Sequence, residues 1–150
     1  MLRNRNCGMA ERDKGGFLAE RSMCHMYRDK YALKVWNVAK DEARNSMIVP
    51  ARIRGTIPYS DLIQKINAIQ FEIEDIDDRN ALATMLGEIS TEEDENGRGM
   101  LSVVVVHKQG DMQPGPGFFE LAEELGKDTS DILVCWINEL KRVHRKWSLS

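Results

Sequence analysis

The chain has 150 residues, of which 42% are hydrophobic and 30% are charged, and its formal net charge is −3 at pH 7. This composition fits one globular domain of ordinary size and excludes a chain that is disordered throughout. No apolar run approaches the ~20 residues that span a bilayer, and the N-terminus lacks the apolar segment of a signal peptide. We therefore expect a cytoplasmic protein that does not associate with membranes.

Charge is distributed unevenly along the sequence. Residues 1–55 contain 12 Lys or Arg against 6 Asp or Glu, whereas residues 56–97 contain 2 against 11. The basic and acidic parts either neutralise each other in the fold, or the basic part is an arm for an anionic partner. We favour mutual neutralisation, because it is the simpler interpretation.

The N-terminal third divides into a flexible basic tail at residues 1–15 and a helical extension at residues 16–55. Apolar residues recur at helical spacing up to about Arg44, although residues 31–35 also alternate and leave a strand open there. The following segment, residues 46–54, contains Pro50, which predicts an edge strand or a linker. The apolar face of the expected helix comprises Met23, Tyr27, Tyr31, Val35 and Val38.

Gly55 marks the main break, and residues 56–150 form the expected α+β core domain. Pro58 suits the first turn of a helix, and Asp77 or Asp78 can cap a second helix after an acidic connection. Both helices carry an apolar stripe that should face the core. The stripes are Tyr59, Leu62, Ile63 and Ile66 in the first, and Leu82, Met85, Leu86 and Ile89 in the second.

The centre of the core domain is predicted to be a strand at residues 100–106, buried on both faces because it is continuously apolar. It follows an acidic, glycine-ended turn at residues 91–99. A loop rich in glycine and proline occupies residues 109–117. The strand has no evident partner nearby, and residues 46–54 or 32–38 could supply one.

Two helices complete the chain. The first starts at Phe118 and is stopped by Gly126, and Thr129 or Ser130 can cap the second, which has a basic C-terminal end. The apolar stripe of the last helix comprises Ile132, Leu133, Trp136, Ile137, Leu140, Val143 and Trp147. The fold class is therefore α+β, a helix-rich single domain with a small sheet.

Three motifs resemble those of a group of small, uncharacterised bacterial and phage proteins. They are LGxI at residues 86–89, GRxMLSxVVVxK at residues 97–108 and PGxGFF at residues 114–119. The resemblance covers about residues 58–126 and implies no particular activity. The order of two helices, a strand, a glycine-rich return and a helix also resembles that of a winged-helix domain, which is an analogy of arrangement only.

A fainter similarity connects Tyr59 and Arg79 with the DNA-binding domain of the alkylguanine alkyltransferases. The Pro-Cys-His-Arg motif of that family is missing here, so alkyl transfer is not implied. Our first hypothesis is a non-enzymatic binding module that acts through a macromolecular partner, with nucleic acid as a candidate. Basic residues that would contact nucleic acid are Arg79, Lys108, Arg142, Arg145 and Lys146.

Two alternative functions use other parts of the chain. A small enzyme would have its site around the loop at residues 107–118 and would use Glu88, His107 or Lys108. The carboxylate that a metal-dependent nuclease places two residues before its lysine is missing, and Glu88 is expected to face solvent. A protein-interaction subunit would instead use the acidic middle of the chain to bind a basic partner.

Metal and cofactor sites have little support in the sequence. Cys7, Cys24 and His25 are fewer than the four ligands of a structural zinc site and lack the usual paired spacing, so we expect no metal. The loop at residues 114–117 precedes a helix and could face an anion, but two prolines remove backbone donors there. We expect no cofactor.

Overall fold

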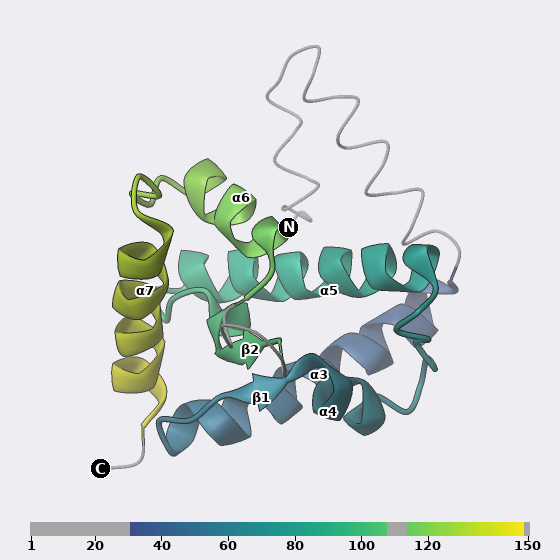
Figure 1. Ribbon diagram of the computed structural model, residues 1–150. Coiled ribbons are helices and arrows are strands. Elements are labelled where there is room, and N and C mark those ends of the chain that lie inside the picture. Colours follow the sequence, from purple (N-terminus) through teal and green to yellow (C-terminus); the bar gives the residue numbers. More distant parts are fainter. Residues whose placement is uncertain (1–30, 108–113, 149–150) are drawn as a thin grey trace.

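The computed structural model describes residues 31–107 and 114–148, and Figure 1 shows a helix-rich α+β unit with one short pair of strands. The tail predicted at residues 1–15 and Lys108 lie outside the described residues. The elements are α3 (Leu33–Arg52), β1 (Ile57–Pro58), α4 (Tyr59–Lys65), α5 (Ile76–Glu95), the 3-10 turn η2 (Leu101–Val104), β2 (Val105–Val106), α6 (Pro116–Glu124) and α7 (Ile132–Trp147). The predicted fold class is confirmed.

Helix α3 corrects two predictions. It begins at Leu33, which excludes a strand at residues 31–35, and it continues through Pro50 to Arg52 where we expected an edge strand or a linker. The helix ends because Arg54 adopts a left-handed conformation (φ 58°) and the amide of Gly55 donates to the carbonyl of Pro50 at 2.8 Å.

The buried face of α3 differs from the predicted one. Val35 and Val38 are exposed, and the face that enters the core carries small residues between one tryptophan and one methionine. Small side chains allow α3 to approach its neighbours closely. The prediction relied on the large apolar residues and therefore selected the wrong face of the helix. The buried residues are Trp36, Ala39, Ala43, Met47, Pro50 and Ala51.

Helix α5 crosses the whole unit, and its ends differ from the prediction. The side chain of Asp75 caps it by accepting hydrogen bonds from the amides of Asp77 and Asp78, so the predicted cap at Asp77 or Asp78 is wrong. The helix then continues to Glu95, so the predicted turn at residues 91–99 begins too early. The stripe Leu82, Met85, Leu86 and Ile89 is buried, as predicted.

The central segment, residues 100–106, is fully buried as predicted but is a strand only at its end. Val105 and Val106 pair in parallel with Ile57 and Pro58, so neither predicted partner segment was correct. A winged-helix domain pairs its strands in an antiparallel hairpin, and the described residues form no such hairpin. The winged-helix resemblance therefore does not extend to the strands.

The 3-10 turn forms because side chains satisfy the backbone there. The amide of Met100 donates to Glu139 Oε2 at 2.7 Å, and the amide of Ser102 donates to Ser90 Oγ at 2.9 Å. Buried amides need such partners wherever a neighbouring strand does not supply them. The two serine hydroxyls also bond to each other at 2.6 Å.

The last two helices are displaced by a few residues from their predicted limits. Helix α6 begins at Pro116, inside the predicted loop, and Gly126 (φ 88°) follows it, as expected. Asp131, rather than Thr129 or Ser130, caps α7. Three residues of the predicted α7 stripe are at least one-third exposed, namely Ile132, Leu133 and Ile137.

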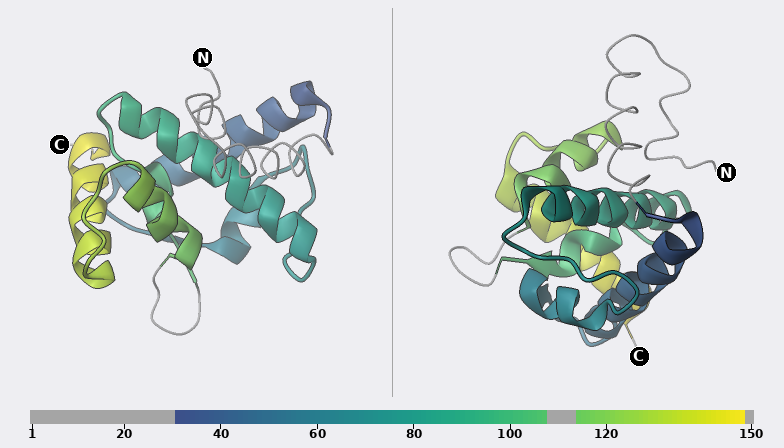
Figure 2. Two further views of the ribbon diagram at one scale, coloured as in Figure 1. Left: turned by 90° about the horizontal axis from the view of Figure 1, so that it is seen from above. Right: turned by 90° about the vertical axis from the view of Figure 1, so that its right-hand side faces the viewer.

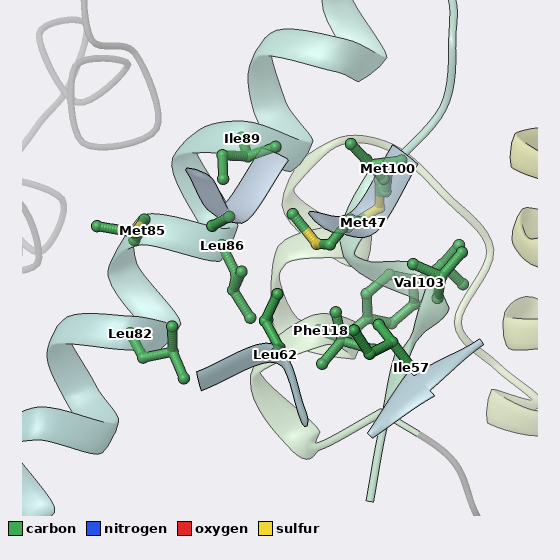
Figure 3. Packing of buried hydrophobic residues seen from close by; sticks show 14 of the residues in the cluster. Met47, Ile57, Leu62, Leu82, Met85, Leu86, Ile89, Met100, Val103 and Phe118 are labelled. Carbon is green, nitrogen blue, oxygen red and sulfur yellow. The ribbon is translucent and has the colours of Figure 1, made fainter. Parts of the chain in front are cut away.

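One hydrophobic core joins the helices from α3 to α7. Figure 3 shows Met47, Leu62, Met85 and Phe118, each from a different helix, gathered around the central segment. Each fully buried large apolar side chain contributes roughly 1.5–3 kcal/mol. The predicted break at Gly55 therefore falls between helices that share one core.

Candidate functional site

The basic face of α3 lies against the acidic C-terminal half of α5. Lys40 Nζ lies 3.2 Å from Glu88 and 2.6 Å from Glu92, and Arg44 pairs with Glu92 and with Glu93, the latter at 3.2 Å. Two basic side chains of the N-terminal third thus pair with three carboxylates of the acidic middle, as mutual neutralisation predicts. These carboxylates are occupied within the fold.

Helix α7 and the segment before it supply further basic partners at the C-terminal end of α5. Asp94 pairs with Lys127 at 2.7 Å and with Arg142 at 3.1 Å. Glu139 is buried and lies within 4 Å of the same two basic side chains. A helix that ends in acidic residues is unfavourable by itself, and these basic partners offset that cost.

A pocket of about 630 Å³ opens on the other side of α5. Figure 2 shows α6 running alongside α5, and the pocket extends between these helices towards α4. We call it the α5–α6 groove. Its lining residues are mostly apolar, and the largest are Tyr59, Ile63, Phe71, Leu82, Leu86, Phe118 and Leu121.

One end of the groove holds two rings in contact. The rings of Tyr59 and His107 lie 5.1 Å apart between centroids, and Gly115 lies beside both. Burial raises the pKa of the Tyr59 hydroxyl, and a hydrogen bond with the backbone of Gly115 opposes that rise. Tyr59 therefore stays neutral at physiological pH and acts as an uncharged hydrogen-bonding group.

Gly87 forms part of the wall in the middle of α5. A Cβ atom there would meet only Leu121 Cδ2, at 3.8 Å, which is an ordinary contact distance. Neither a tight packing contact nor a positive φ requires glycine at this position. Glycine inside a helix costs about 0.5–1 kcal/mol relative to alanine. Alanine would therefore fit at this position, in contact with Leu121 of α6.

The described members of the predicted nucleic-acid set lie in two separate places. Arg79 lines the groove in the first turns of α5, whereas Arg142 pairs with Asp94 near the end of the same helix. Fifteen residues separate Arg79 from Asp94, a distance of about 22 Å along a helix that rises 1.5 Å per residue. Arg145 and Lys146 are exposed in the last turn of α7.

The predicted enzyme residues do not converge either. Glu88 is buried and accepts a hydrogen bond of 2.9 Å from Trp36 Nε1, so our expectation that it faces solvent is wrong. It faces α3, whereas His107 is exposed and lines the groove. Lys108 lies outside the described residues.

Sequence reasoning missed the groove but not all of its residues. Arg79 was assigned to one hypothesis and His107 to another, yet both line the same pocket. Gly87 appeared only as part of a motif. The available signal was a glycine inside a strongly helical stretch, which should be explained by packing or function.

Comparisons with protein-family models, with curated proteins and with solved structures found no match for this chain. None of the described helices is long and apolar enough to cross a membrane. Across residues 31–107 and 114–148, no three His, Cys, Asp or Glu side chains gather in a way that could hold a metal ion.

Proposed function

We propose that this protein is a non-enzymatic binding module that receives an apolar part of a macromolecular partner in the α5–α6 groove. The observation that carries the proposal is the groove itself, which α4, α5 and α6 line mostly with apolar side chains. The volume, about 630 Å³, lies within the range of about 300–1,000 Å³ that is typical of ligand sites.

A protein partner fits the groove better than nucleic acid does. The walls are built from aromatic and aliphatic side chains, including Phe71, Leu86 and Leu121. Burial of such surface drives association between proteins, whereas nucleic-acid binding depends mainly on basic side chains that contact phosphate. Arg79 is the only Lys or Arg among the described residues that line the groove.

The test fills the groove by enlarging a residue that lines it. Gly87→Phe places a ring between α5 and α6, and Asn138→Phe adds the same ring at an exposed position on α7 as the matched control. A displayed library of random peptides is selected on the full chain, and the affinities of the selected peptides are then measured on both variants. We expect Gly87→Phe to weaken binding about tenfold or more and Asn138→Phe to have little effect.

Two results would overturn the proposal, provided that circular dichroism shows both variants to be folded. One is that every selected peptide binds Gly87→Phe and the wild type with the same affinity. The other is that the chain binds duplex DNA equally in the wild type and Gly87→Phe, with loss in an Arg142→Ala, Arg145→Ala, Lys146→Ala triple variant. The second result would move the function to the end of α7.

A further inference from the structure

The described part of the chain begins beside the α5–α6 groove. The ring of Tyr31 packs edge-on against Phe71, with 6.2 Å between centroids, and its hydroxyl lies 3.5 Å from Asp78 Oδ1. Both Phe71 and Asp78 line the groove. A second ring contact, with Trp36 at 5.8 Å, holds Tyr31 against α3. The 30 residues that precede Tyr31 are therefore tethered at one end of the groove.

The sequence just before Tyr31 is rich in large apolar side chains. Met23, Tyr27 and Tyr31 recur at intervals of four, which places side chains on one face of a helix. Apolar side chains of this number are unfavourable in water unless a surface covers them. The large apolar residues of this segment are Phe17, Leu18, Met23, Met26 and Tyr27.

The length of this segment suits the groove to which it is tethered. Residues 17–30 would extend about 21 Å as a helix and further in any more open conformation. The groove follows α5 from Asp78 to Gly87, which is about 14 Å along the helix axis. Ala83 and Gly87 have the smallest side chains of the lining, so another backbone can approach α5 closely there.

We propose that residues 17–30 of the same chain occupy the α5–α6 groove and compete with a partner for it, a competition that rests on the proposed function. A short tether gives the segment an effective concentration on the order of millimolar, which favours this occupant over a free peptide of equal affinity. The apparent affinity of the partner falls with the fraction of molecules whose groove is empty. The segment therefore limits access to the binding site.

The first measurement needs no partner. A photoreactive benzophenone analogue of phenylalanine replaces Tyr27 in the full chain, and mass spectrometry identifies the residues to which it cross-links. The matched control carries the same analogue at Met9, outside the proposed segment. Mixing isotopically light and heavy chains separates cross-links within one chain from those between two chains. We expect cross-links within one chain to residues of the groove from position 27, and their loss in Gly87→Phe.

The second measurement uses the peptides selected on the full chain. The double variant Met23→Ser, Tyr27→Ser should bind them about threefold or more tightly than the wild type, because the groove is empty in more molecules. The matched double variant Leu2→Ser, Met9→Ser removes two apolar side chains from outside the segment and should leave the affinity unchanged.

Three outcomes would overturn the inference. Cross-links from position 27 that miss the groove, or that persist in Gly87→Phe, would place the segment elsewhere. Cross-links only between light and heavy chains would show that a second copy supplies the segment. Unchanged peptide affinity in Met23→Ser, Tyr27→Ser would remove the competition and leave the proposed function intact.

One outcome separates this inference from the proposed function in the other direction. Cross-links to the groove within one chain, lost in Gly87→Phe, would support docking of the segment even if every selected peptide bound Gly87→Phe as well as the wild type. The groove would then serve residues 17–30 alone, and the proposed function would fail.

Discussion

The two ends of α5 carry the same number of carboxylates in different surroundings. Five occur in residues 72–78 and five in residues 88–95. At the C-terminal end, basic side chains of α3 and α7 pair with the carboxylates, and two of these, Glu88 and Glu93, are buried. At the N-terminal end, Asp75 caps the helix, and Glu72 lines an open groove.

This difference shows that acidic composition does not by itself indicate a binding surface. Carboxylates at the C-terminal end bind basic side chains of α3 and α7 and the indole of Trp36, so their role is structural. Carboxylates at the N-terminal end lie where the helix dipole favours negative charge, and their contribution to packing is small. Stability measurements should therefore separate the two ends clearly.

The largest expected effect is at Glu139, which supports the C-terminal end of α5. Glu139→Ala should lower the free energy of unfolding by about 3 kcal/mol, because the buried amide of Met100 loses its acceptor and Lys127 and Arg142 lose a counter-charge. Urea denaturation measures this loss. Glu139→Gln keeps an acceptor for the amide and should cost less, and a loss below about 1 kcal/mol in Glu139→Ala would contradict a structural role.

A second comparison removes two charges at each end. The double variant Glu92→Gln, Glu93→Gln should lose about 2 kcal/mol, since Lys40, Arg44 and Arg98 would all lose partners. The matched variant Glu72→Gln, Glu74→Gln should change stability by less than about 0.5 kcal/mol, as expected for exposed positions. Equal losses in the two variants would remove the distinction between the ends.

The third prediction concerns the middle of α5. Gly87→Ala should raise the free energy of unfolding by about 0.5–1 kcal/mol, because alanine favours the helix and its Cβ meets only Leu121 at 3.8 Å. Thermal unfolding detects such a gain. A loss of stability in Gly87→Ala would mean that α5 and α6 need glycine for packing.

The smallest effect is a dependence on alkaline pH. The pKa of Tyr59 is raised mainly by burial, so the folded state holds this proton more tightly than the unfolded state does. Its contribution to stability is complete below the unfolded value of about 10 and is lost as pH rises through the folded pKa. Tyr59→Phe should therefore lose less stability than the wild type when pH is raised above 10.

The control for that measurement is Tyr31→Phe. The pKa of Tyr31 is also raised, by burial first and by Asp78 next, so both tyrosines contribute to the alkaline loss in the wild type. Each variant should remove its own part of that loss. An identical pH dependence in the wild type and Tyr59→Phe would contradict the burial of the Tyr59 hydroxyl.

The spacing of apolar residues predicted the features that depend on a single helix or strand. The stripe Leu82 to Ile89 and the burial of residues 103–106 follow from apolar spacing, and the structure confirms both. The end of α5 could not be predicted locally, because its acidic last turns are stabilised by Lys40, Arg44 and Arg142, which are distant in the sequence.

The candidate site depended even more on contacts between distant segments. The burial of Glu88 follows from its hydrogen bond to Trp36, 52 residues away. The groove needs α4, α5 and α6 together, so no stretch of sequence contains its outline. Pattern reasoning could identify Arg79 and His107 as notable residues, but it had no means of placing them in one pocket.

The hydrogen bonds of the central segment also bear on how the chain folds. Ser90, Glu139 and Ile57 reach residues 100–106 from α5, α7 and β1, so this segment is satisfied only when three separate parts of the chain have assembled. Partial unfolding of any one of them would expose buried amides without partners. The amides of Met100 and Ser102 should therefore exchange with solvent hydrogen only when the whole unit opens, which makes this segment a reporter of global unfolding.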